Sequence, residues 1–280
     1  VLALVGGARY GGGKKSGGKP SHSFMAYGYD TFSEASYACW QVRTAWVRLL
    51  SDKFNLRFMG NDRLLLHPGF VENDSELWDV MAEAIKQSGN EGKIGIQIDV
   101  AAGTYYNKEK DVFEGLFSRE DKTRNDLINL YRDMVKKYPF VIIEDPLDED
   151  DYEGHALLTR ELGVQIVGDD LFTTNMERLK EGMAVGAGNS VLLKVNQIGT
   201  ISEAFDTVRL AYSKGYGVMP CSSRGEGADI ADYTVGLGTG NIRESGLDQT
   251  ANRLRQIEAE LGSRAMFPGK AGLKSGPAKI

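Results

Sequence analysis

The chain has 280 residues, of which 41% are hydrophobic and 26% charged, and its formal net charge is -6. This composition is typical of a globular protein that buries its own core, and the acidic balance argues against nucleic acid as the main partner. Cys39 and Cys221 lie far apart, which excludes a disulfide scaffold, and no run of eighteen apolar residues could span a membrane. We therefore expect a cytoplasmic protein that binds neither nucleic acid nor membranes.

The chain opens with an apolar run, VLALVGG, which we expect to be a strand, followed by a Gly- and Lys-rich stretch over residues 6–20. Because this stretch has few apolar side chains to bury, we expect it to be a mobile loop. The simplest interpretation is a flexible linker, and the alternative is a lid over an anionic ligand. Four cations lie within it, namely Arg9, Lys14, Lys15 and Lys19.

Strands and helices are expected to alternate from there onward. The first are a strand at HSFMAYGY, a helix over 31–50 capped by Thr31 or Ser33, an irregular segment over 58–70 and a helix capped by Asn73. The predicted order then continues with KIGIQIDV, helix 124–137, FVIIEDP, helix 151–162, VQIVGDD, helix 175–182, SVLLKVN, helix 200–214, YGVMPCS, helix 226–237, TGNIR and helix 248–261. Such alternation indicates parallel strands, and six or more units favour a closed α/β barrel over an open sheet. No shift in composition marks a second domain, so we expect a single barrel domain over 1–280.

Acidic residues stand at the carboxyl ends of three successive predicted barrel strands: Asp99, Glu144 and Asp169. In a barrel these ends meet on one face, where active sites are built. Three carboxylates there would repel one another, and a hard divalent cation is the simplest relief. Because all the ligands are oxygens, magnesium, manganese or calcium is favoured over zinc, and magnesium is the preferred choice because it commonly binds through a few carboxylates with water or substrate completing its shell. The alternative, in which each acid only caps the following helix, suits one strand better than three.

Lys194 ends the next strand, SVLLK, at the same level. Burial and a nearby metal would favour its neutral form, and a neutral amine is a competent base. The alternative is an ion pair with one of the acids. A metal that steadies a carboxylate, facing a lysine that removes the adjacent proton, is the arrangement that makes enolate intermediates accessible.

Six motifs in this order resemble the barrel domain of enolase: IQIDVAAG, VIIEDPLDEDD, IVGDDLFTTN, VLLKVNQIGTISEA, GYGVM and RLRQIEAELG. The similarity is strong over residues 90–265 and weak before them. It implies an enolase-type TIM-like barrel whose small N-terminal capping domain is absent from this sequence. It also implies that Asp99, Glu144 and Asp169 bind magnesium and that Lys194 removes the proton at C2 of a phosphoglycerate. Enolases are commonly dimers, so a homodimer is a further expectation.

The sequence departs from the enolase pattern where the family holds its acid and its substrate. GNDRLLLHPGF, with Arg63 and His67, replaces the stretch that carries the catalytic glutamate, and Arg9 lies where the family has a loop histidine. The family's glutamine-glutamate pair has become His22-Ser23. At the segment with which the family binds the substrate anion, this sequence has Ser222, Ser223 and Arg224. Arg243 replaces the family's substrate-binding lysine of the last barrel strand.

We therefore expect a magnesium-dependent enolase-like lyase that ionises a phosphorylated carboxylate such as 2-phosphoglycerate, with dehydration impaired. The predicted substrate-binding residues are Arg9, Arg63, Ser222, Ser223, Arg224 and Arg243. His67 is a candidate replacement acid, His22 a candidate to line the site, and His155 is expected on the surface. The alternatives are an enzyme with a second, phosphonate substrate, as in carboxyphosphonoenolpyruvate synthase, a non-catalytic paralogue, and a racemase or ammonia-lyase of the wider superfamily.

Overall fold

The computed structural model describes residues 2–5, 10, 19–54, 64–65, 71–243 and 248–278. The strands are β1 (Leu2–Val5), β2 (Ser21–Ala26), β3 (Leu64–Leu65), β4 (Ile94–Asp99), β5 (Tyr106–Asn107), β6 (Val112–Phe113), β7 (Phe140–Glu144), β8 (Gln165–Gly168), β9 (Ser190–Leu193) and β10 (Gly217–Pro220). The α-helices are α1 (Phe32–Phe54), α2 (Ser75–Gln87), α3 (Arg124–Lys137), α4 (Tyr152–Glu161), α5 (Met176–Val185), α6 (Val195–Ile198), α7 (Ile201–Ser213), α8 (Asp229–Gly236) and α9 (Gln249–Leu261). Three short 3-10 helices are η1 (Ala102–Tyr105), η2 (Gly262–Arg264) and η3 (Gly269–Gly272).

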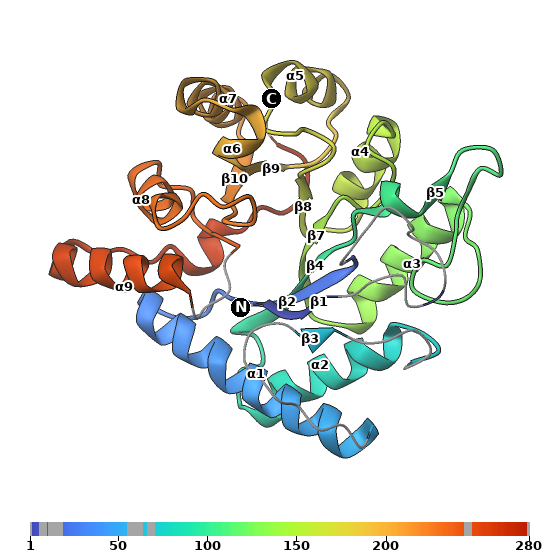
Figure 1. Cartoon of the computed structure of the whole chain (residues 1–280), viewed down its shortest axis with the longest axis horizontal. Coiled ribbons are helices and arrows are strands. Elements are labelled where there is room, and N and C mark those ends of the chain that lie inside the picture. Colours follow the sequence, from blue (N-terminus) through green and yellow to red (C-terminus); the bar gives the residue numbers. More distant parts are fainter. Residues whose placement is uncertain are drawn as a thin grey trace.

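Eight strands form one sheet in the order β10-β9-β8-β7-β4-β2-β1-β3, while β5 and β6 pair as a separate hairpin. The sheet curls at the centre of the molecule and the helices form a ring around it (Figure 1). From β4 to β10 all neighbours in this sheet are parallel. The carboxyl ends of these strands therefore share one end of the curled sheet, and the expected α/β barrel class is confirmed. Closure is not: among the described strands, β10 and β3 are the two edges of this sheet and do not pair with each other.

The first part of the sheet differs from the expectation of parallel strands throughout. β2 is antiparallel to both of its neighbours, β1 and β4. Alternation of apolar and polar residues identifies a strand but carries no information on its direction. The reversed strand places its first residue, Ser21, opposite the last residue of β4, Asp99. The start of β2 thus lies at the same end of the barrel as the carboxyl ends of the parallel strands.

Capping residues in the sequence fix several helix boundaries. Thr123 and Asp126 form a capping box at the start of α3, which spans the predicted residues. Asn175 accepts hydrogen bonds from two backbone N–H groups at the start of α5, and Asp248 does the same at α9. These caps satisfy backbone N–H groups in the first turn of each helix and so fix where it begins.

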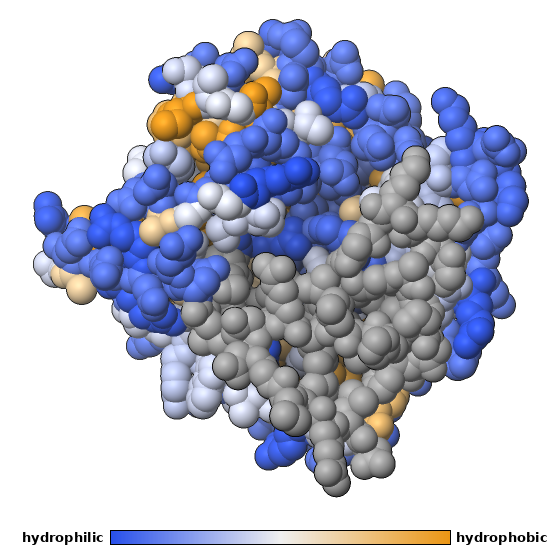
Figure 2. Space-filling model, viewed as in Figure 1, coloured by the Kyte–Doolittle hydropathy of each residue, from blue (hydrophilic) through white to orange (hydrophobic). Residues whose placement is uncertain are grey.

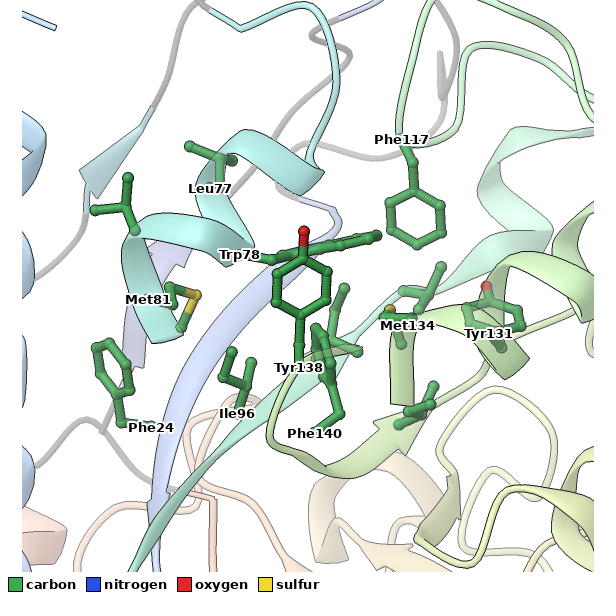
Figure 3. Close-up of a cluster of buried hydrophobic side chains, with 14 of the residues drawn as sticks. Phe24, Leu77, Trp78, Met81, Ile96, Phe117, Tyr131, Met134, Tyr138 and Phe140 are labelled. Atoms are coloured by element: carbon green, nitrogen blue, oxygen red, sulfur yellow. The ribbon is translucent and has the colours of Figure 1, made fainter. Parts of the chain in front are cut away.

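A cluster of aromatic side chains fills the space between the sheet and the helices α2 and α3 (Figure 3). Trp78 of α2 lies at its centre, with ring centroids 5.4 Å from Phe117, 5.6 Å from Tyr138 and 5.6 Å from Phe140, all in edge-on geometry. Its indole Nε1 donates a 2.9 Å hydrogen bond to His22 Nε2. His22 thus joins the layer outside the sheet, so the prediction that it lines the site is wrong.

The coloured part of the surface in Figure 2 is mostly hydrophilic. Among the described helices, none combines the length and the apolar character needed to cross a bilayer.

His155 is fully buried on α4, so the expectation of a surface position is wrong. Its Nδ1 lies 2.8 Å from the backbone carbonyl of Asp151, and its Nε2 has no hydrogen-bond partner among the described residues. Burial lowers the pKa of His155 from 6.5 to about 4. The sequence pattern around it, with five acids among the seven residues before it, concealed that this residue faces the core.

The low pKa of His155 predicts acid sensitivity. Between pH 6.5 and 4 the unfolded chain binds a proton at His155 that the folded chain does not. The free energy of unfolding therefore decreases as the pH is lowered from 6.5 to 4, by about 3 kcal/mol in total. Urea unfolding at pH 7 and pH 5 measures the effect, and His155→Leu is expected to remove most of this residue's share. An equal loss of stability in the wild type and the variant would show that other groups dominate.

Candidate active site

The three predicted metal ligands lie at the carboxyl ends of adjacent strands. Asp99 ends β4 and pairs in register with Glu144, which ends β7, and Asp169 directly follows β8. All three side chains are buried, with 1%, 0% and 5% of the residue exposed in that order. Buried carboxylates need cations or hydrogen-bond donors close by, because the loss of hydration is otherwise too costly.

Lys194, directly after β9, forms an ion pair with Asp169 through its Nζ and the carboxylate Oδ2. Burial alone would raise the pKa of Asp169, but the charge and hydrogen bond of Lys194 outweigh it and lower that pKa. Burial favours the neutral amine of Lys194, yet the carboxylates of Asp169 and Glu144 outweigh this effect and raise its pKa. Lys194 is thus protonated in this arrangement, which matches the ion-pair alternative from the sequence.

Two further cations reach the other acids. The guanidinium Nη1 of Arg243 lies 2.6 Å from Asp99 Oδ2 and 2.9 Å from Glu144 Oε1. The Lys19 amine also contacts Asp99 Oδ2. Burial, together with repulsion from Arg243, lowers the pKa of Lys19 to about 8. Arg243, predicted to bind substrate, therefore contacts two of the predicted metal ligands in this structure.

One group of three acids among the described residues brings its ligand atoms within 4.8 Å of one another: Glu144, Asp145 and Asp169. Asp145 accepts hydrogen bonds from the backbone N–H groups of Asp169 (3.1 Å), Asp170 (2.8 Å) and Leu171 (3.3 Å). These bonds use both of its oxygens. The side chain of Asp145 therefore holds the loop that carries Asp169, and its share in ligating a cation is smaller than the convergence alone suggests.

Amide side chains complete the acid centre and were missed by the sequence analysis. Gln97 Nε2 donates to Glu144 Oε2 at 3.3 Å, and Gln197 Nε2 donates to Asp169 Oδ1 at 3.2 Å. Gln97 lies two residues before Asp99 on β4, so the period of the strand could have placed it on the same face. Gln197 lies on α6, a short helix that no sequence pattern predicted.

The predicted substrate-binding segment follows β10 at the same end of the barrel. Its backbone is joined to the region of Lys194 by a 3.2 Å hydrogen bond from Asn196 Nδ2 to the carbonyl of Arg224. Ser223 and Arg224 are exposed and Ser222 is partly buried. The Arg224 guanidinium has no ion pair within the part of the chain that the structure describes.

Three further predicted residues, Arg9, Arg63 and His67, lie outside the described residues. The same holds for most of the Gly- and Lys-rich stretch over 6–20, of which Tyr10, Lys19 and Pro20 are described.

The family model for the enolase C-terminal TIM barrel domain matches residues 11–275 of this chain. The chain belongs to the enolase family. It is 41% identical over 258 residues to an enolase of Methanococcus aeolicus, and this alignment covers 89% of the chain and 59% of the relative. It is 38% identical over 272 residues to an enolase of Methanopyrus kandleri, and this alignment covers 91% of the chain and 63% of the relative. The enolase-family barrel thus spans about three fifths of the length of these curated relatives, and the resemblance found in the sequence is confirmed.

Proposed function

We propose that this chain carries the proton-removing half of an enolase-type lyase site, acting on a phosphorylated carboxylate such as 2-phosphoglycerate. The observation that carries the proposal is the placement of Lys194 beside Asp169, both buried, at the strand ends that also hold Asp99 and Glu144. Clusters of buried, mutually perturbed ionisable groups are typical of catalytic sites. Membership of the enolase family agrees with this chemistry.

The acid centre suits a hard divalent cation, and we propose magnesium. Asp99 Oδ1 is buried and has no hydrogen-bond partner among the described residues, and the nearby carboxylates offer only oxygen donors. Asp99, Glu144 and Asp169 would hold the ion. A bound magnesium would stabilise the negative charge that develops on the substrate carboxylate.

Lys194 is the proposed base. In its neutral form, Nζ would take the proton from the carbon next to the carboxylate, and the electron pair of the broken C–H bond would move onto the carboxylate as an enolate. Asp169 orients the amine through their ion pair, and Gln197 fixes Asp169 in turn. The protein thereby sets the position of the nitrogen before substrate binds, which reduces the entropy cost of the step.

The substrate anion is proposed to bind at the loop after β10. Arg224 presents an exposed guanidinium there, and Ser222 and Ser223 offer hydroxyl groups. Arginine suits planar and tetrahedral oxyanions because its donors form a rigid fork. Arg9, Arg63 and the candidate acid His67 stay predictions, since they lie outside the described residues.

The reaction is tested by incubating the wild-type chain with magnesium and 2-phosphoglycerate in D2O. Loss of the C2 proton signal measures proton removal, and absorbance of phosphoenolpyruvate measures dehydration. We expect deuterium to enter at C2 faster than dehydration, because the family's acid glutamate is replaced around Arg63. Dehydration that keeps pace with exchange would overturn the inference of a lost acid, and the absence of both would overturn the proposed function.

A further inference from the structure

The side chain of Arg243 crosses the end of the barrel to reach the acid centre. Its backbone N–H donates to Pro220 O at 2.9 Å, and it bridges in parallel to Cys221, so its position beside β10 is fixed. Its Nη1 lies 2.6 Å from Asp99 Oδ2 and 2.9 and 3.1 Å from the two carboxylate oxygens of Glu144. Its Nη2 donates to Ser21 Oγ on β2 at 2.8 Å.

Arg243 Nη1 lies within 3.1 Å of three carboxylate oxygens, as a small bound cation would. One guanidinium nitrogen carries two hydrogens and cannot direct one at each of three oxygens, so its positive charge is shared among them. The side chains of Asp99 and Glu144 are 1% and 0% exposed, and that of Arg243 is 14% exposed. Little water is therefore available to screen the two carboxylates, and the guanidinium, together with the Lys19 amine at Asp99 Oδ2, offsets their charge in its place.

The oxygens that Arg243 contacts are those that would ligate the magnesium of the proposed function. A cation and a guanidinium nitrogen cannot occupy the same space between Asp99 and Glu144, and like charges at this distance repel strongly in a buried site. We propose that Arg243 is an internal counter-ion of the acid centre, and that magnesium binds only as the guanidinium leaves the two carboxylates. This inference rests on the proposed function.

Arginine is well suited to this role. Its fork holds the carboxylates through one nitrogen and Ser21 through the other, whereas a lysine offers a single nitrogen. Once displaced, the guanidinium stays tethered to the same strand end and becomes available to the substrate anion. Arg243 thus offsets the charge of the acid centre, and metal binding would release its guanidinium for the substrate.

A purely structural salt bridge would behave differently. If Arg243 only joins the strand ends, its loss lowers stability equally with and without metal and leaves metal affinity unchanged. If it competes with magnesium, its loss lowers stability in EDTA, raises metal affinity, and leaves the metal-saturated protein close to the wild type. The two roles are therefore separated by two readouts that do not involve catalysis.

The experiment is magnesium titration by calorimetry on the full chain, paired with thermal unfolding in EDTA and in saturating magnesium. Arg243→Met is compared with the wild type and with Arg124→Met, which removes an arginine paired with Asp151 away from the acid centre. We expect Arg243→Met to bind magnesium at least about tenfold more tightly, the scale by which groups around metal ligands shift affinity. Arg124→Met is expected to match the wild-type affinity.

Arg243→Gln covers the case in which the methionine variant does not fold in EDTA, because its amide keeps hydrogen-bond donors without the charge. Tighter binding in the glutamine variant supports the competition equally. Unchanged or weaker binding in the folded Arg243 variants, with normal binding in the wild type, overturns this inference alone. If neither the wild type nor any variant binds magnesium, the proposed metal centre fails and this inference with it.

Discussion

Replacing Lys194 with methionine is expected to slow hydrogen exchange at C2 of 2-phosphoglycerate by about two to four orders of magnitude. Methionine keeps about the length and volume of the side chain but removes the nitrogen that we propose takes the proton. The lysine amine is buried against Asp169 at the end of the barrel, so solvent cannot easily substitute for it. Proton NMR in D2O with magnesium present measures the exchange rate directly.

The matched control for this variant is Lys214→Met, which removes an exposed lysine at the end of α7. Its exchange rate is expected to equal that of the wild type. Circular dichroism of both variants is needed because Lys194→Met leaves the buried carboxylate of Asp169 without its partner, which costs stability. A folded Lys194→Met variant that exchanges within threefold of the wild type would show that another group is the base.

The sequence predicts the helices of this barrel better than its strands. The boundaries of α3 agree with the prediction because the capping box of Thr123 and Asp126 is encoded within four adjacent residues. The predicted last strand, TGNIR, is present only as isolated bridges at Gly240 and Arg243. Gly240 has φ of +85°, outside the range of a regular strand, and a period of two cannot reveal such a residue.

Strand ends in the sequence also predict where the acids lie, but not what they contact. The positions of Asp99, Glu144 and Lys194 follow from the place of each residue in its own strand. The contact of Arg243 with two of these acids depends on how the strand ends curl together. Sequence spacing holds no information on that distance, so the arginine could be assigned to the substrate but not to the carboxylates.

Glu144 and Asp145 also show that the sequence predicts the position of an acid but not its contacts. In a continuous strand they would face opposite sides of the sheet. The backbone instead turns at Asp145, whose φ is +44°, and its carboxylate points to the loop after β8. Aspartate tolerates this left-handed conformation better than most residues. The pair therefore combines a carboxylate that contacts side chains of the acid centre with one that accepts backbone hydrogen bonds.

The hydrogen bonds of Asp145 to the backbone predict that Asp99, and not Asp145, is the third ligand of the proposed metal centre beside Glu144 and Asp169. Asp99→Asn is expected to weaken magnesium binding by about a hundredfold or more, because it removes the charge of a direct ligand, and loss of an indirect partner alone costs about 10- to 100-fold. Asp145→Asn is expected to lower the free energy of unfolding by about 1–3 kcal/mol, since an amide cannot accept all three backbone N–H bonds. Its effect on metal affinity is expected to stay below about tenfold.

Calorimetric titration with magnesium and urea unfolding of both variants separate the two roles. The convergence of Glu144, Asp145 and Asp169 within 4.8 Å favours Asp145 as the third ligand, while Asp99 is favoured by its Oδ1, which has no hydrogen-bond partner among the described residues. Asp99 is the better candidate because both oxygens of Asp145 already accept hydrogen bonds, and a bound cation would repel those N–H dipoles. Loss of binding in Asp145→Asn, with binding retained in Asp99→Asn, would reverse the assignment and leave Asp99 as the partner of Arg243 and Lys19 alone.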